Sequence, residues 1–235
     1  MDTPSELLPD DRPPPTDHSA PPAARQGLPT ASLPVPSADF AGLVLCGGQS
    51  RRMGRPKVLL PFGDETMLQR VVRLVGEVVQ PVIVVAGQEQ ELPELAASVQ
   101  IVRDRRPGRG PLEGLAAGLA ALGGRAEAAF VTSCDVPLLK PALVRRLLAM
   151  LGDCDAVVPH VEGFDQPLAA VYRRSVLPHA EALLAEGRLR PMFLFDRVRT
   201  RRVPPEEFAD VDPNLESLRN INTPEDYEAV ARGGR

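Results

Sequence analysis

Cysteine and histidine are too few and too scattered to build a structural framework. The three cysteines, Cys46, Cys134 and Cys154, are odd in number and share no CxxC spacing, and the three histidines form no helical ligand pair. Neither a zinc site nor a disulfide framework is therefore indicated, and reduced thiols fit a cytoplasmic protein. No apolar run approaches the roughly 20 residues of a membrane span, and the first residues lack the pattern of a secretory signal. We expect a cytoplasmic protein that does not bind or span a membrane.

Lysine is nearly absent from this chain, and aromatic residues are scarce. Of 27 basic residues only Lys57 and Lys140 are lysines, and aromatic residues make up 4% of the chain. A nucleic-acid surface needs aromatic residues interleaved with its basic ones, and the basic run from Arg197 to Arg202 has none. The run alternates basic with apolar or small residues, and this alternation predicts a half-exposed edge strand. We expect no nucleic-acid partner. Lysine's compact, mobile charge suits a phosphate that shifts during a reaction, which makes Lys57 a candidate phosphate contact.

Composition divides the 235 residues into a tail and one domain. Ten of the 26 prolines fall within residues 1–38, which show little apolar periodicity. Such a segment cannot offset its ordering entropy, so we expect residues 1–38 to form a disordered, Pro-rich tail. Residues 39–235 are long enough to bury one sizeable core and are expected to form a single domain.

Apolar runs typical of buried strands alternate with segments of helical period along this domain. Strands are expected at residues 40–46, 81–86, 99–103, 128–133, 156–159 and 168–172. Helices are expected at residues 66–78, in a Glu-rich piece ending at 97, and at 112–122, 141–151, 175–186 and 223–232. This alternation predicts an α/β fold, a three-layer, Rossmann-like and mostly parallel sheet with helices on both faces.

The stretch from Leu43 to Lys57 joins the first expected strand to a basic, glycine-rich loop. Gly47 and Gly48 lack a Cβ, so their amides can approach a phosphate closely. Four cations follow between residues 51 and 57, and no acidic residue occurs before Asp64. The local potential is therefore positive although the formal net charge of the chain is −4. The pattern predicts an anion cradle.

Two aspartates directly follow expected strands. Loops at the carboxyl ends of parallel strands line the ligand crevice of such folds, so Asp104 and Asp135 are both candidates for it. Asp135 is the better candidate for a Mg²⁺ ligand, because that ion takes few oxygen ligands from protein and the rest from phosphates and water. An aspartate that only caps the following helix is the structural alternative. Asp104 could bond a base or a ribose.

The glycine loop matches neither of the commoner phosphate-binding patterns. Val58 replaces the hydroxyl residue of a Walker loop, and Gly-x-Gly-x-x-Gly is absent after the strand. The stretch instead resembles the motif Leu-x-Gly-Gly-x-Ser-x-Arg-Met-Gly-x-x-Lys of the molybdenum cofactor guanylyltransferase family. The matching residues are Leu45, Gly47, Gly48, Ser50, Arg52, Met53, Gly54 and Lys57. Three later segments resemble the family in the same order: residues 110–112, 134–137 and 220–224.

The resemblance implies a nucleotidyltransferase that transfers GMP from GTP to molybdopterin carrying molybdenum and releases pyrophosphate. It implies Mg²⁺ as cofactor, GTP and molybdopterin as substrates, and transient contact with molybdenum cofactor delivery proteins. In this resemblance Lys57 and Asp135 are catalytic, and Asp135 is the metal ligand. The implied nucleotide-binding residues are Leu45, Cys46, Gly47, Gly48, Arg52, Lys57, Asp104 and Asp135, and Asn220 and Asn222 support the site.

Several alternatives stay open. Arg55-Pro56-Lys57 resembles the related molybdopterin cytidylyltransferases, and a base-contacting asparagine of some guanylyl enzymes is replaced by Val85 or Gly87. The paired Gly47-Gly48 favours guanine because it leaves room for a purine. Another NTP-dependent nucleotidyltransferase, for example one acting on a sugar phosphate, is a further alternative. A nucleotide-binding adaptor without turnover is an alternative of another class, and the joint presence of Lys57 and Asp135 argues against it.

Overall fold

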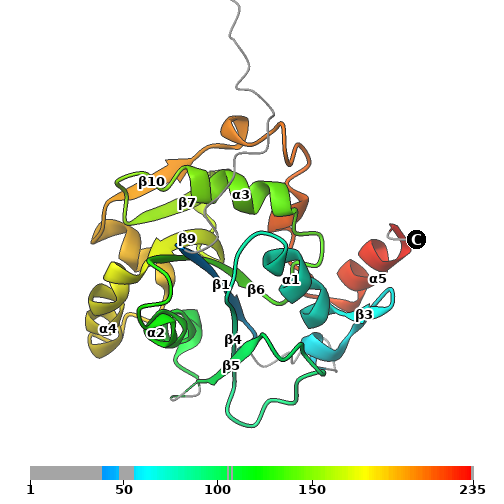
Figure 1. Ribbon diagram of the computed structural model, residues 1–235. Helices are drawn as coiled ribbons and strands as arrows, with labels where there is room; N and C mark the ends of the chain where they lie inside the picture. Colours follow the sequence, from blue (N-terminus) through cyan, green and yellow to red (C-terminus); the bar gives the residue numbers. More distant parts are fainter. Residues whose placement is uncertain (1–38, 48–55, 105, 107, 234–235) are drawn as a thin grey trace, which may run out of the picture. The chain divides into compact units, whose positions relative to one another are not determined.

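A single large sheet organises the domain in the computed structural model (Figure 1), which describes residues 39–47, 56–104, 106 and 108–233. Across the sheet the strands run in the order β10 (Thr200–Val203), β7 (Ala156–Val161), β9 (Ala169–Arg173), β6 (Ala128–Ser133), β1 (Phe40–Leu45), β4 (Val82–Ala86) and β5 (Gln100–Arg103). All neighbours pair in parallel except β9, which is antiparallel to both β6 and β7. The predicted α/β fold with a mostly parallel sheet is confirmed.

Two short strand pairs lie outside the order of the main sheet. β8 (Phe164–Asp165) pairs antiparallel with the end of β7, and β2 (Pro61–Phe62) and β3 (Glu65–Thr66) form a separate hairpin. The short 3₁₀ helices are η1 (Lys57–Leu59), η2 (Arg174–Val176), η3 (Pro191–Asp196), η4 (Pro205–Glu207) and η5 (Glu216–Leu218). The sequence patterns predicted none of β2, β3 and β8, because two-residue strands are too short to show alternation.

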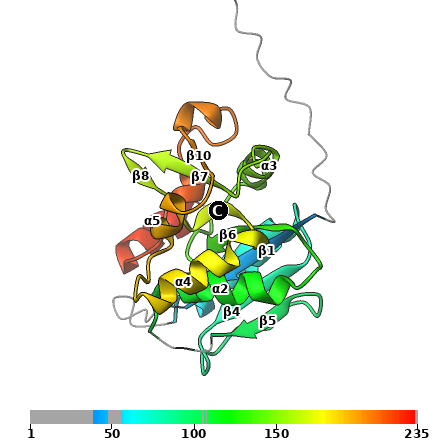
Figure 2. The same ribbon diagram turned by 90° about the vertical axis from the view of Figure 1, so that its left-hand side faces the viewer.

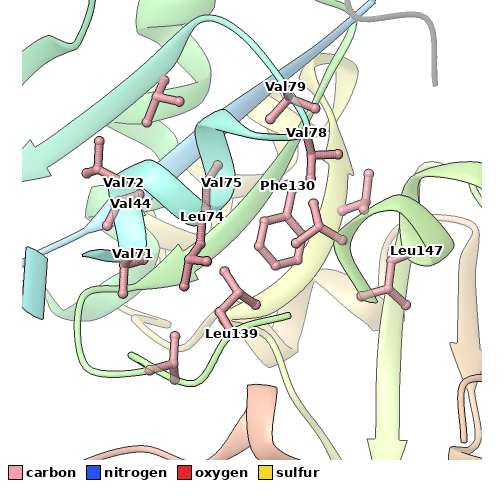
Figure 3. Close-up of a cluster of buried hydrophobic side chains, with 14 of the residues drawn as sticks. Val44, Val71, Val72, Leu74, Val75, Val78, Val79, Phe130, Leu139 and Leu147 are labelled. Carbon is pink, nitrogen blue, oxygen red and sulfur yellow. The ribbon is translucent and has the colours of Figure 1, made fainter. Parts of the chain in front are cut away.

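Helices cover both faces of the sheet. α1 (Met67–Gly76) and α3 (Pro141–Ala149) pack on one face, and α2 (Gly110–Leu122) and α4 (Leu177–Ala185) pack on the other. Figure 2 shows α2 and α4 side by side on their face. Figure 3 shows Val75 of α1, Phe130 of β6 and Leu147 of α3 in one buried cluster. An apolar layer therefore covers each face of the sheet. Because the core strands are buried on both faces, their sequences are continuous apolar runs.

Two helix starts carry the signals that the sequence predicted. Thr66 and Gln69 form a capping box at α1, in which each side chain bonds the backbone N–H of the other residue. α5 (Pro224–Gly233) begins after Thr223, whose Oγ1 accepts a hydrogen bond from the N–H of Asp226. Among the residues that the structure describes, no helix is both long and apolar enough to cross a membrane.

The Glu-rich piece ending at residue 97 was expected to be a helix, and this prediction is wrong. Residues 87–97 contain turns and irregular backbone, with no helix or strand. Pro93 lies in the middle of the piece, where it would remove a helical hydrogen bond and clash with the preceding turn. Side chains from elsewhere hold the segment instead, as Gln69 Nε2 donates to the carbonyl of Glu94 at 2.8 Å.

The strand order reverses between β1 and β6. From β1 the chain builds outward through β4 to β5, and it then returns to add β6 on the other side of β1. In open α/β sheets such a reversal leaves a crevice outside the carboxyl ends of the two strands, where ligands bind. Gly47 follows β1 and Asp135 follows β6, so the fold itself brings these two predicted positions to one crevice.

At Gly42, strand β1 packs closely against α1. A Cβ at this position would lie 2.2 Å from Cγ1 of Val75, a stiff and fully buried side chain. We expect Gly42→Ala to lower the free energy of unfolding by about 1–3 kcal/mol, because overpacking forces the helix away from the sheet. Urea denaturation measures this. Gly124→Ala is the control, since its Cβ would meet no atom within 4 Å, and equal losses in the two variants would contradict the expectation.

Candidate active site

Three polar side chains from distant parts of the chain meet outside β6. Lys57 Nζ lies 2.9 Å from Oδ2 of Asp135 and 2.8 Å from Oδ1 of Asn222. Oδ1 of Asp135 accepts a hydrogen bond from the hydroxyl of Ser133. The side chains of Lys57 and Asp135 are each 15% exposed, so both are held in place and still reach the solvent of the crevice. We call Lys57, Asp135 and Asn222 the site cluster.

The segment before α5 is tied to Asp135 through its backbone. Ile221 is buried, and its N–H donates to the carbonyl of Asp135 at 2.8 Å. The backbone N–H groups of Asn222 and Thr223 donate to the Asp226 carboxylate, and these bonds hold the pKa of Asp226 below its usual value. The result is a fixed turn that presents Asn222 to Lys57. Asn220, the weaker of the two predicted asparagines, is exposed.

The end of β1 is linked to the loop after β4. Gln90 donates from Nε2 to the carbonyl of Cys46 at 3.0 Å, and its Oε1 accepts from the N–H of Gly87 at 3.0 Å. Arg103 fastens the same loop by donating to the carbonyls of Gly87 and Gln90. Gly47 follows directly, and a Cβ there would meet no atom within 4 Å. The strand ends that carry the predicted nucleotide loop are thus braced by side chains.

Cys46 and Leu45 belong to the packed floor of the crevice. Leu45 is buried against the face that carries α2, and Cys46 is buried on the opposite face. The neighbouring thiol of Cys134 and then burial raise the pKa of Cys46 well above its usual value. A buried thiol of this kind is a packing residue and not a nucleophile.

Asp104 follows β5, three strand positions from β6. Its N–H donates to the carbonyl of Ala86 at 2.8 Å, and its Oδ1 accepts from the N–H of Arg106 at 3.0 Å. A strand spacing of roughly 4.8 Å places β5 about 14 Å from β6. Asp104 therefore lies on the same edge of the sheet as the site cluster but not within it. This separation suits the two ends of one elongated nucleotide.

The structure gathers some of the predicted site residues and not others. Lys57, Asp135 and Asn222 are brought into contact, and Leu45, Cys46 and Gly47 line up beside them along β1. Gly48 and Arg52 lie outside the described residues. Sequence reasoning missed Ser133, the N–H of Ile221, and Gln90. Ser133 had a usable signal, since it lies two residues before Asp135 at the end of the same strand.

The other lysine forms a separate structural pair. Lys140 Nζ lies 2.9 Å from Oδ1 of Asp212, which is fully buried, and 2.7 Å from Glu216. Burial alone would raise the pKa of Asp212, but the hydrogen bonds from Lys140 and from the N–H of Ser217 outweigh it and lower that pKa below its usual value.

This pair makes a testable contribution to stability. A carboxyl group whose pKa is lowered by folding stabilises the protein above its unfolded-state pKa of about 3.9, and the stabilisation is lost as the pH falls through the folded-state pKa. We expect Asp212→Asn to lower the free energy of unfolding by roughly 2 kcal/mol at pH 7 and by much less at pH 3. Urea unfolding at the two pH values measures this, and an equal loss at both would contradict it.

The reversal of strand order and the pairing of Lys57 with Asp135 beyond β6 fit a nucleotidyltransferase. The family of MobA-like NTP transferase domains matches residues 42–201, and the chain belongs to this family. It is 39% identical over 200 residues to a probable molybdenum cofactor guanylyltransferase of Mycobacterium ulcerans, covering 83% of this chain and 94% of that one. The protein is therefore a molybdenum cofactor guanylyltransferase homologue, as the resemblance in its motifs implied.

Solved structures share the fold. Molybdopterin-guanine dinucleotide biosynthesis protein A from Archaeoglobus fulgidus superposes with a TM-score of 0.68 at 23% identity, covering 82% of this chain and 97% of that one. A Mycobacterium tuberculosis H37Rv protein solved in complex with manganese gives a TM-score of 0.54 at 18% identity, covering 83% and 98%. At these identities the likeness concerns the fold.

Proposed function

We propose that this protein transfers GMP from GTP to molybdopterin carrying molybdenum, forming the guanine dinucleotide form of the cofactor and pyrophosphate. The observation that carries the proposal is the site cluster, in which a lysine from the glycine-loop end and an aspartate from β6 meet at the switch point of the sheet. The relative from Mycobacterium ulcerans is named for this activity. Residues 39–235 act as the catalytic domain.

Each part of the site has a role in this reaction. The terminal phosphate of the pterin attacks the α-phosphorus of GTP, and pyrophosphate leaves in line. Lys57 and the amides around Gly47 and Gly48 hold the leaving phosphates, so that the charge that develops on them meets fixed donors. Asn222 fixes the ammonium of Lys57 at 2.8 Å. A phosphate nucleophile is already anionic at neutral pH, so the reaction needs no general base.

The donor set beside β6 fits a magnesium ion. Asp135 offers a carboxylate that accepts a hydrogen bond from the Ser133 hydroxyl, and the side-chain oxygen of Asn222 bonds the same Lys57 ammonium that pairs with Asp135. Among the described residues, no three His, Cys, Asp or Glu side chains gather as a metal cage. A single carboxylate suits an ion that takes its other ligands from phosphates and water, and Asp135 would hold it. When bound, the ion supplies positive charge against the α-phosphate.

Pyrophosphate release tests the proposal. The purified protein is expected to release pyrophosphate from GTP only when molybdopterin and a divalent cation are both present. CTP in place of GTP, and a sugar phosphate in place of molybdopterin, test the two alternative transferases. GTP binding with no pyrophosphate release under any of these conditions would favour the adaptor and contradict the proposal.

A further inference from the structure

Glu113 carries a buried carboxyl oxygen with no partner. The residue lies in the first turn of α2 and is 8% exposed, and its Oε2 is buried without a hydrogen bond to any group of the described structure. Nearly all buried polar atoms in folded proteins are paired, so an unpaired carboxyl oxygen requires an explanation. A buried carboxyl oxygen without a hydrogen bond destabilises the fold unless a ligand donates a hydrogen bond to it.

The position of Glu113 relates it to the nucleotide site. α2 begins at Gly110, just after Asp104 and β5, at the edge of the sheet that carries the site cluster. Side chains of a helix tilt toward its amino end, so the Glu113 carboxylate extends toward this edge. The next residue, Gly114, rests on Leu45 of β1 and Val85 of β4, since a Cβ there would meet both within 4 Å. The first turn of α2 therefore covers the strand ends from which the nucleotide loops start.

We propose that Glu113 recognises the guanine base by accepting hydrogen bonds from its N1–H and 2-amino groups. The inference rests on the proposed function and names the residue that selects the base. A carboxylate has two acceptor oxygens and so matches two adjacent N–H donors, whereas cytosine has no such pair of donors. The pterin of the acceptor carries the same pair, at its N3–H and 2-amino group. The first turn of α2 follows Asp104 in the chain and rests on the ends of β1 and β4, where the predicted nucleotide-binding residues lie, and this favours the base of the nucleotide.

Nucleotide binding without acceptor tests this assignment. Inosine triphosphate differs from GTP only by lacking the 2-amino group. Calorimetric titration is expected to show that the wild-type protein binds GTP about 10- to 100-fold more tightly than inosine triphosphate, the range given by the loss of one hydrogen bond to a charged group. In Glu113→Gln an amide donor faces the donors of guanine, and this preference is expected to fall close to one. Glu113→Asp, which keeps the carboxylate, is expected to retain part of it.

Controls separate the possible outcomes. Glu181→Gln makes the same change on an exposed position of α4 and is expected to leave the preference unchanged. An unchanged GTP preference in Glu113→Gln together with a tenfold loss of molybdopterin binding would assign the same chemistry to the pterin. If Glu113→Gln changed neither the preference for GTP over inosine triphosphate nor the binding of molybdopterin, the inference would be overturned and the proposed function would stand. Absence of GTP binding by the wild-type protein would contradict the proposed function itself.

Discussion

Asp135→Asn is expected to fold normally and to lose about 10³-fold in turnover. Asparagine keeps the size of the side chain and can still accept the hydrogen bond from Ser133. It removes the charge that pairs with Lys57 at 2.9 Å and that would hold the metal ion. A factor of about 10³ corresponds to roughly 4 kcal/mol of lost transition-state stabilisation. Initial rates of pyrophosphate release at saturating GTP measure the effect.

Asp153→Asn is the matched control for this variant. Asp153 is an exposed aspartate in the turn after α3, and its replacement is expected to leave the rate unchanged. A thermal unfolding midpoint within a few degrees of wild type would show that Asp135→Asn is folded. If the folded variant turned over at a rate comparable to wild type, Asp135 would have no place in the chemistry.

The second large effect is expected at Lys57. Lys57→Met removes the cation between Asp135 and Asn222 and is expected to lower turnover about 10²- to 10³-fold, the cost of losing one preorganised charge at the leaving group. Lys57→Arg is the sharper variant, because arginine is by far the commoner base in this chain. Its planar guanidinium cannot place a compact charge between the two oxygens, so at least a tenfold loss is expected.

Lys140→Arg provides the comparison for Lys57→Arg. Lys140 is the only other lysine of the chain and also pairs with a buried acid, but it lies in the separate cluster with Asp212. Its replacement is expected to change stability and to leave turnover near wild type. Equal activity losses in the two Arg variants would show that the effect at Lys57 comes from a weakened fold and not from the site.

The main sheet and the site cluster could be predicted from sequence for different reasons. The core strands are continuous apolar runs, which local composition reveals; all six of them are present, and so is the expected edge strand, as β10. Lys57 was predicted from the scarcity of lysine and Asp135 from its place after an expected strand, and the resemblance to a known family supported both and added Asn222. A motif does not say which of its side chains are exposed: the side chain of Cys46 is buried in the core, whereas the side chain of Lys57 reaches the crevice.

Features that depend on contacts between distant segments could not be predicted from the sequence. The brace formed by Gln90 joins residues 44 positions apart, and the bond from Ile221 to Asp135 spans still more of the chain. The antiparallel direction of β9 also leaves no local pattern, because a strand buried on both faces has the same composition in either direction. The buried Oε2 of Glu113 is of the same kind, since only the folded surroundings show that it has no hydrogen bond within the described part of the chain.

The tie between Asp135 and residues 221–222 has a consequence for protein synthesis. A nascent chain can form β1, β4 and β6 on the ribosome well before Ile221 and Asn222 emerge from the exit tunnel. Until then the carbonyl of Asp135 lacks the amide of Ile221, and Lys57 lacks the oxygen of Asn222. Translation therefore completes the active centre late, and a prematurely terminated product would retain most of the sheet without a finished catalytic cluster.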